Sequence, residues 1–278
     1  MKKLFLPLAL LLLATACKPT VSPDGNFTLA DFNEINLDST NSQLLTDDVA
    51  IGTGVLVRIV NDSILAVKTI RSDNQVMLYN TLSGEVRPAV AKGSGPLEMI
   101  RVAGMSATPD GTLWIVGSGD NKVMTAAWND STVTTDERFT AQTAIVNGTP
   151  NARGGAIVLP VGDCNARIAV LGQQGEITAT TGSFPQIEIP DSVMYNNFTF
   201  QADIAYSPDR NIAVVSNKSW PEIEIYGLAD NASRHIFGPM VSDARMEEQP
   251  TPMGAMYIQK TMLFMFDGVV AGPESFFV

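Results

Sequence analysis

Short runs of apolar residues recur along the chain from residue 51 onward, and clusters of glycine, proline, asparagine and aspartate separate them. No window in this part keeps apolar residues at the helical spacing i, i+3, i+4 and i+7. Short runs rich in valine, isoleucine and leucine between turn-forming clusters are typical of β-strands. The pattern therefore predicts an all-β fold.

Four of these runs open a repeated unit. Each one follows a polar turn, and a second apolar run begins about 11 residues later, a spacing that suits two antiparallel strands joined by a turn. The first runs cover residues 64–67, 113–116, 157–159 and 212–215, and the second runs cover 76–79, 123–126, 168–171 and 223–226. A period of about 50 residues with several short strands predicts a β-propeller, in which each blade is a four-stranded sheet that packs against its neighbours.

The last part of the sequence predicts a fifth unit. The apolar run 262–266 stands where the next first run is due, and 276–278 stands where its second run is due. We therefore expect about four complete blades plus the start of a fifth in residues 27–278, with strands in 27–29 and 55–60 completing a blade from the other end of the chain. A terminal apolar strand exposes an unpaired edge, so an incomplete, C-terminally truncated six-bladed propeller is favoured over a four-bladed ring with a tail.

The N-terminus has the pattern of a secretion signal. Lys2 and Lys3 precede an apolar stretch at residues 4–13 that is too short to span a bilayer, and Ala14-Thr15-Ala16 forms a small-residue cleavage zone. The next residue, Cys17, has the position of the acylated cysteine in the lipobox that bacterial lipoproteins carry. We expect residues 1–16 to be a signal peptide, Cys17 to carry the lipid and residues 17–26 to be a tether; ordinary cleavage that leaves a free thiol is the alternative.

The charge composition of the chain excludes some classes of binding partner. Charged residues make up 17% of the chain against roughly 25% in an average domain, and the net charge is −11. Nucleic acid and anionic lipid surfaces attract clustered lysine and arginine, and the sequence has no such cluster. The expected contact with a membrane is therefore the lipid anchor alone.

Three stretches carry a resemblance to a known family. Residues 92–99 read KGSGPLEM and resemble the G-x-G-P-x-E-F turn of TolB-like six-bladed propeller lipoproteins of Bacteroidota, with Met99 in place of phenylalanine. Residues 205–209 and 235–239 are similar to other stretches of that family. The resemblance covers roughly residues 30–278 and implies a propeller in the cell envelope, at the outer membrane and facing the periplasm or the surface. It implies no catalytic residue.

Few residues suggest catalysis. His235 is the only histidine, in what is expected to be a turn, and the sequence has no G-x-S-x-G motif, so a catalytic triad is disfavoured. Cys164 is expected in a turn with Arg167 as the only nearby cation, and an inert cysteine is favoured over a reactive thiol. With one histidine and two cysteines, a zinc site of the usual kind is not expected within one chain.

Some other polar and aromatic residues have the chemistry of ligand contacts. Several aspartates, such as Asp110 and Asp209, occupy turns, where capping of the backbone is favoured over a Ca²⁺ site, and no other cofactor is expected. Gly93-Ser94-Gly95 beside Lys92 is expected to form a turn and not a phosphate loop, because no helix follows. Trp220, in a polar turn, is the candidate ligand contact.

These features predict an envelope-anchored lipoprotein with a propeller that binds a peptide, a glycan or a partner protein. The alternatives are a metal-dependent propeller enzyme of lactonase or lyase type, which would need a group of acids or amides at the channel, and an inactive truncated relic.

Overall fold

The computed structural model describes residues 25–26, 53–70, 72–161, 166–184, 197, 200–218, 222–237, 246–251, 254–259, 269–271 and 276–277. In this part of the chain all regular elements are strands, as the sequence predicts. No helix among these residues has the length and apolar character needed to cross a bilayer.

Four four-stranded antiparallel sheets follow one another along the chain, and each is a meander of consecutive strands. The first sheet contains β2 (Thr53–Ile59), β3 (Ile64–Ile70), β4 (Asn74–Asn80) and β5 (Val86–Lys92). The second contains β7 (Val102–Ala107), β8 (Leu113–Gly117), β9 (Lys122–Asn129) and β10 (Thr132–Thr140). The third contains β11 (Ala144–Pro150), β12 (Ala156–Val161), β13 (Ile168–Leu171) and β14 (Ile177–Thr181). The fourth contains β15 (Ala202–Ser207), β16 (Ile212–Asn217), β17 (Glu222–Gly227) and β18 (Ser233–Phe237).

Short strands extend two of these sheets. β6 (Glu98–Met99) pairs in parallel with β5, and β1 (Gly25–Asn26) pairs in parallel with β18. β1 includes the last two residues of the expected tether, so the described end of that segment lies against the outermost strand of the fourth sheet. Two further hairpins are β19 (Met246–Thr251) with β20 (Gly254–Gln259), and β21 (Val270–Ala271) with β22 (Phe276–Phe277).

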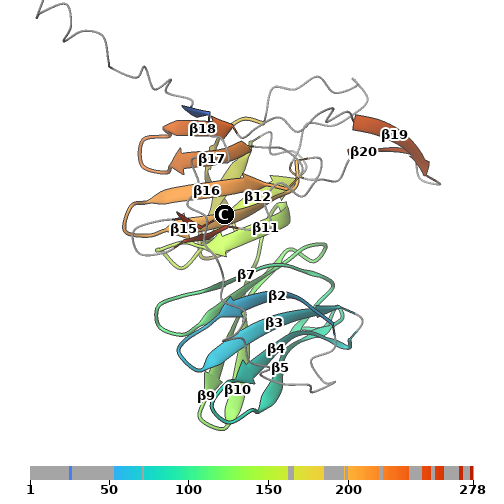
Figure 1. Cartoon of the computed structure of the whole chain (residues 1–278), viewed down its shortest axis with the longest axis vertical. Helices are drawn as coiled ribbons and strands as arrows, with labels where there is room; N and C mark the ends of the chain where they lie inside the picture. The colour runs from blue at the N-terminus through green and yellow to red at the C-terminus, as the bar shows by residue number, and fades with distance from the viewer. Residues whose placement is uncertain are drawn as a thin grey trace, which may run out of the picture.

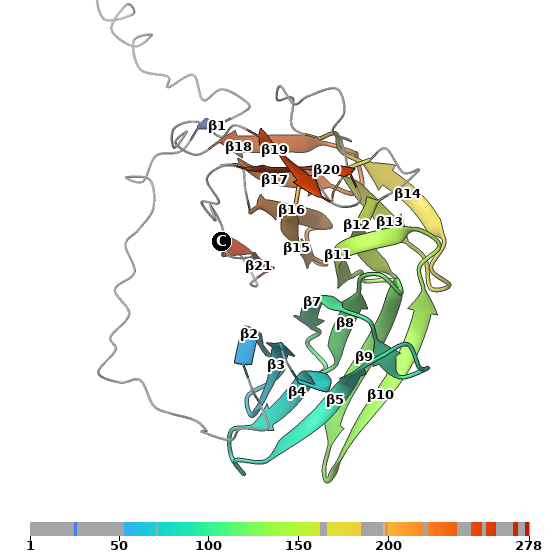
Figure 2. The ribbon, with the colours of Figure 1, turned by 90° about the vertical axis from the view of Figure 1, so that its right-hand side faces the viewer.

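The sheets stand side by side in an arc, with their first strands toward a common centre (Figure 1, Figure 2). Contacts run between β2 and β7, between β7 and β11, between β11 and β15, and between β15 and β21. Apolar clusters fill the spaces between successive sheets, for example around Leu113 between the first and second sheets and around Ile157 between the third and fourth. This arrangement of blades around a centre is a β-propeller.

Burial follows the position of each strand in its blade. All residues of β8 are buried because this strand packs against a neighbouring sheet on both faces. The outermost strand β14 is exposed over four of its five residues. β10 begins with alternating exposed and half-buried residues. Middle strands therefore read as continuous apolar runs and outer strands as polar ones, which explains why the sequence showed the middle strands most clearly.

The four predicted pairs of runs are confirmed as β3–β4, β8–β9, β12–β13 and β16–β17, all antiparallel. The turns before and after these pairs also have the expected chemistry. Backbone φ is positive at Gly84, Gly111, Gly154, Gly175, Asn211 and Asn231, a conformation that glycine and asparagine adopt most easily.

One expectation about the ends of the propeller is wrong. Residues 53–59 do not complete a blade from the other end of the chain: they form β2, which pairs with β3 through a tight turn in which the Asn61 side chain accepts bonds from the backbone N–H groups of Ser63 and Ile64. A short turn makes the next strand in sequence the nearest partner, so β2 is the innermost strand of its own sheet.

The fifth unit is described only in part. β22 pairs with β21, and β21 contacts the innermost strand β15, so residues 276–277 lie beside the first described strand of a fifth unit. The connection between β18 and β21 contains the β19–β20 hairpin and is longer than in the earlier units, which shifts the repeat. The predicted run 262–266 lies outside the described residues.

Candidate functional site

Several candidates from the sequence fall where the structure gives no description: Cys17, Cys164 and Trp220 all lie outside the described residues. Three aromatic side chains within strands can be placed. Trp114, Tyr79 and Tyr226 are buried in the propeller. The structure therefore assigns these three side chains to packing.

The glycine-rich loop after β5 is a turn closed by its own glutamate. The Gly95 N–H donates to Glu98 Oε2 at 2.8 Å, and the Gly93 N–H donates to the Met99 carbonyl at 3.0 Å. A Cβ atom on Gly93 would overlap the Glu98 carboxylate, so this carboxylate fills the space that a phosphate would need. The Lys122 ammonium donates to the carbonyls of Gly95 and Glu98 at 2.5 and 3.1 Å. The turn interpretation is confirmed.

Several of the described carboxylates cap backbone N–H groups. Asp110 Oδ1 accepts from the Thr112 N–H at 3.1 Å, and Asp120 Oδ2 accepts from the Ile100 N–H at 2.8 Å. Hydrogen bonds from Thr108 and Thr112 hold the pKa of Asp110 below its ordinary value. Within the described ranges no group of three or more histidine, cysteine, aspartate or glutamate side chains is placed to hold a metal ion.

A charged cluster lies at the centre of the arc instead, at the end where the innermost strands begin. Asp203, the second residue of β15, is nearly buried and forms an ion pair with Lys218, which directly follows β16 (Oδ1 to Nζ, 3.1 Å). The same Oδ1 accepts from the Asn147 side chain on β11 at 2.7 Å. One carboxylate thus joins side chains from the third and fourth sheets.

Two cations of the first sheet lie within the electrostatic reach of this carboxylate. Arg58 on β2 donates through Nε to the Met105 carbonyl of β7 at 3.1 Å, and Asp203 acts electrostatically on its guanidinium. Lys68 on β3 lies within the fields of Arg101, Lys218 and Asp203. β2 and β3 stand across the centre of the arc from β15 and β16 (Figure 2), so charges from opposite blades meet here. We call Arg58, Lys68, Arg101, Asp203 and Lys218 the channel cluster.

Partial burial changes the acid–base behaviour of two of these cations. Burial lowers the pKa of the Lys68 ammonium below its ordinary value, the positive charges of Arg101 and Lys218 lower it further, and Asp203 opposes them. Burial also lowers the pKa of the Arg58 guanidinium, again against the effect of Asp203. Each group is a cation held partly out of water, so an opposite charge nearby stabilises it more strongly than at an open surface.

Asn147 donates to Asp203 of the channel cluster and packs closely against Gly104. The Asn147 amide nitrogen donates to the Ala202 carbonyl at 3.2 Å as well as to Asp203. Its Oδ1 lies over Gly104 of β7, where a Cβ atom would overlap it. Gly104 therefore leaves the room in which Asn147 crosses from the third sheet toward Asp203.

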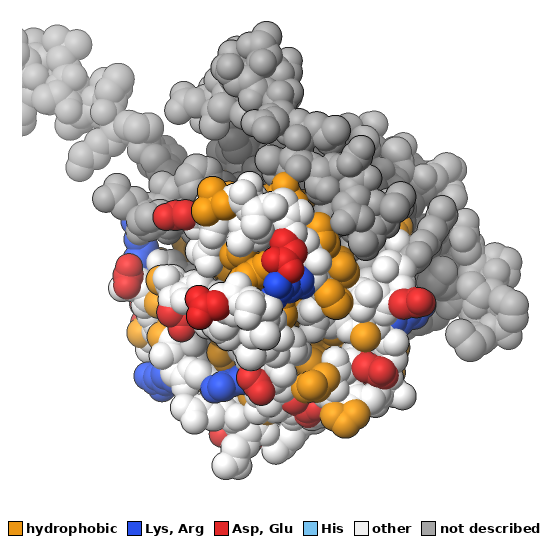
Figure 3. Space-filling view, turned by 90° about the horizontal axis from the view of Figure 1, so that it is seen from below, with side chains coloured by type: hydrophobic (Ala, Val, Ile, Leu, Met, Phe, Trp, Pro, Cys, Tyr) orange, Lys and Arg blue, Asp and Glu red, His pale blue; other side chains and the backbone are white. Residues whose placement is uncertain are grey.

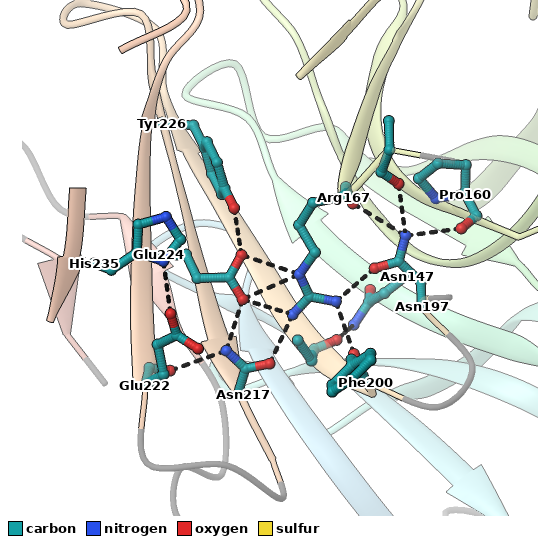
Figure 4. Close-up of polar contacts among 12 residues, drawn as sticks. Asn147, Pro160, Arg167, Asn197, Phe200, Asn217, Glu222, Glu224, Tyr226 and His235 are labelled. Carbon is teal, nitrogen blue, oxygen red and sulfur yellow. Dashed lines mark hydrogen bonds and ion pairs between the residues drawn. The ribbon is translucent and has the colours of Figure 1, made fainter. Parts of the chain in front are cut away.

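A buried polar network around Arg167 includes residues close in sequence to Asp203 and Lys218 (Figure 4). The side chain of Arg167, next to β13, is fully buried, and its Nε lies 3.0 Å from both carboxylate oxygens of Glu224 on β17. Its Nη1 donates to Asn197 Oδ1 at 2.5 Å and to the Phe200 carbonyl at 2.8 Å. Its Nη2 donates to Asn217 Oδ1 at 2.7 Å and lies 2.9 Å from Glu224 Oε1.

The position of this network explains its relation to the site. Phe200 lies three residues before Asp203, and Asn217 is the last residue of β16, immediately before Lys218. By holding both segments, Arg167 fixes the start of β15 and the end of β16. The network therefore positions the Asp203–Lys218 ion pair without contacting it.

His235 belongs to the edge of this network and not to a catalytic triad. It lies on β18, opposite Glu224, because β18 pairs in register with β17; the expected turn is wrong. Its Nδ1 is 2.6 Å from Glu222 Oε1. Among the described residues, Glu222 Oε2 is buried without a hydrogen-bond partner. The Tyr226 hydroxyl donates to Glu224 Oε2 at 2.5 Å, and burial followed by the charge of Glu224 raises the pKa of this phenol far above its ordinary value.

Sequence reasoning missed the channel cluster because its members come from four separate segments. One signal was present: Arg58, Lys68 and Asp203 are single charged residues inside otherwise apolar strands. An ionic side chain in a strand that packs on both faces needs a polar surrounding, and in a propeller the centre of the ring can provide one.

The arc of four-stranded antiparallel sheets with a charged centre defines this chain as a β-propeller protein. No protein family matches it by sequence, and no curated protein matches it either. Solved structures with similar folds include a protein of unknown function from Bacteroides thetaiotaomicron (TM-score 0.45, 11% identity, covering 69% of this chain and 45% of that one) and virginiamycin B lyase from Staphylococcus aureus (0.45, 14%, 78% and 73%). A third is a protein described as an exported protein from Bacteroides fragilis (0.47, 15%, 73% and 54%). The chain thus spans about half the length of the two Bacteroides proteins.

Proposed function

We propose that this protein is a lipid-anchored binding module of the bacterial envelope, and that its propeller binds a partner at the channel cluster. The lipobox-like sequence before Cys17 supports the anchor, together with the resemblance of residues 92–99 to a turn of envelope propellers. Under this proposal Cys17 holds the protein at a membrane, and the propeller presents the channel cluster to a peptide, a glycan or another protein.

One observation carries the choice of the channel cluster as the binding surface. Side chains from the first, third and fourth sheets meet there around Asp203 together with Arg101, which directly precedes β7, although the residues are far apart in sequence. Elsewhere charges are dispersed: on the face drawn in Figure 3, acidic and basic side chains of the described residues are interspersed, and no broad basic patch forms on that face. A cluster that depends on the whole ring is suited to recognition, because the blades hold its groups rigidly.

Arrays of peptides and glycans incubated with the mature chain test this proposal. We expect at least one class of array member to bind the wild-type protein and to bind Lys218→Met at least about tenfold more weakly, since a charge-assisted bond contributes about 1.5–3 kcal/mol. Lys92→Met, which removes an exposed lysine from β5, is the matched control and should bind as the wild type does. Binding that Lys218→Met leaves unchanged would place the recognition surface elsewhere.

A further inference from the structure

The channel cluster has more positive than negative charge. Four of its side chains are cationic and one is a carboxylate, whereas the chain as a whole has a net charge of −11. Asp203 already pairs with Lys218 and accepts from Asn147, both through Oδ1, and its single negative charge is shared among four cations. The cluster is therefore a local positive site in an acidic protein.

The cations of the channel cluster differ in the hydrogen bonds and ion pairs that their side chains form. Arg58 donates to the carbonyls of Met105 and Val57 at 3.1 and 3.0 Å, and Lys218 pairs with Asp203. Among the described residues, by contrast, the Lys68 ammonium and the Arg101 guanidinium have no hydrogen-bond acceptor or ion-pair partner; Arg101 is exposed, and its backbone carbonyl accepts from the Ser118 N–H. Since the Lys68 ammonium is half-buried, water satisfies it less well than it would at the surface.

Like charges surround this ammonium. Arg101, directly before β7, and Lys218, directly after β16, act on it electrostatically, as does Asp203 of β15, so the two cations oppose its charge while one carboxylate supports it. An anion placed between Lys68, Arg101 and Lys218 would relieve this repulsion. It would also supply the acceptor oxygens that Lys68 and Arg101 lack.

We propose, resting on the binding function above, that the channel cluster recognises an oxyanion of the partner, with Lys68, Arg101 and Lys218 as its donors. The chemistry is that of a carboxylate or a phosphate group, because both present several oxygens to separate donors. Asp203 is the internal competitor: it holds Lys218 in place when no anion is bound and repels the ligand when one enters. Its removal should therefore strengthen anion binding, whereas removal of a cation should weaken it.

Calorimetric titration of the mature chain, residues 17–278 in detergent, tests this inference with inorganic phosphate and with succinate as separate probes. Chloride at equal ionic strength is the reference, so that general screening cancels. We expect one of the two probes to bind with a Kd of about 1 mM or below, and Lys68→Met to raise that Kd about tenfold. Methionine keeps the apolar stem of lysine, so the sheet can still pack around it. A preference for phosphate or for succinate identifies the source of the oxyanion.

Asp203→Asn is the variant that separates recognition from folding. If Asp203 competes with the ligand, Asp203→Asn lowers the Kd severalfold. If the Asp203–Lys218 ion pair serves only the fold, its loss disturbs the site and the affinity falls instead. Lys92→Met should keep the wild-type Kd. Failure of both probes to bind the wild-type chain, or a weaker affinity in Asp203→Asn, overturns the oxyanion inference.

The array experiment then distinguishes this failure from failure of the proposed function. If a neutral array member still binds in a way that depends on Lys218, the binding module stands and only the oxyanion class is wrong. If Lys218→Met does not change binding to the array members while phosphate or succinate still binds, the small-anion site stands and the recognition surface lies elsewhere.

Discussion

Replacing Arg167 by methionine should strongly destabilise the propeller, because it would leave the Glu224 carboxylate charged and buried without its cation. Both side chains have 0% exposure, and the guanidinium contacts both carboxylate oxygens at 3.0 Å. The same substitution removes the donors to Asn197, Phe200 and Asn217. The substitution thus breaks the ion pair and leaves three further acceptors without their donor.

The magnitude follows from what remains around the carboxylate. Removing one partner of a buried ion pair costs about 3–5 kcal/mol, since the other charge stays out of water. The Tyr226 hydroxyl and the Asn217 amide still donate to Glu224, at 2.5 and 2.7 Å, which keeps the expected cost for Arg167→Met near the lower end, about 3 kcal/mol. Domains are stable by about 5–15 kcal/mol, so this is a large fraction of the total.

Urea unfolding followed by circular dichroism measures the effect. We expect a lower midpoint for Arg167→Met at an unchanged denaturant slope. Arg87→Met is the matched control: Arg87 pairs with Glu85 at a partly exposed site, where an ion pair contributes about 1 kcal/mol or less. Arg167→Met combined with Glu224→Leu should lose less than the single variant, because no unpaired charge remains. A loss below about 1 kcal/mol in Arg167→Met, or a double variant worse than the single one, would refute the reasoning.

Three further changes have defined outcomes. Tyr226 keeps its proton in the folded chain, whereas in the unfolded chain it ionises near the ordinary value of 10.0, so the wild-type free energy of unfolding should be unaffected by this group below pH 10.0 and fall above it by about 1.4 kcal/mol per pH unit. Tyr226→Phe should lack this part of the alkaline slope in urea titrations, and an identical slope in both proteins would contradict the assignment. Gly104→Ala should lower the free energy of unfolding by about 1–3 kcal/mol because the new methyl group displaces Asn147; an unchanged urea midpoint would show that Asn147 can move at no cost. Cys17→Ala should transfer the protein from the membrane fraction to the soluble fraction of lysed cells, and retention in the membrane fraction would argue against lipid anchoring.

The sequence predicted the middle of each blade well because those strands are determined locally. β8 and β12 are apolar over their whole length since both of their faces pack, and the turns beside them carry residues that tolerate positive φ, such as Gly111 and Gly154. Strand, turn and next strand lie within about 15 residues, so nearest neighbours in sequence are also neighbours in the sheet.

The sequence pattern was less informative at the ends of the arc. The expectation that residues 55–60 complete a distant blade was wrong, and the expected position of the fifth unit assumed a constant period. The pairing of a strand depends on the length of its connection and on which edge is open. The long connection between β18 and β21 broke the assumed period, and periodicity alone contained no information about it.

By itself, the sequence determined the all-β class, the repeat of about 50 residues and the closed Gly93 turn, because each depends on residues close together in the chain. Only the tertiary structure decided that Arg58, Lys68, Arg101, Asp203 and Lys218 form one cluster, and that Arg167 positions part of it. These residues lie on different blades, and their charges act on one another only when the sheets stand around a common centre. Electrostatic interaction depends on distance in space and on burial, and neither can be read from separation along the chain.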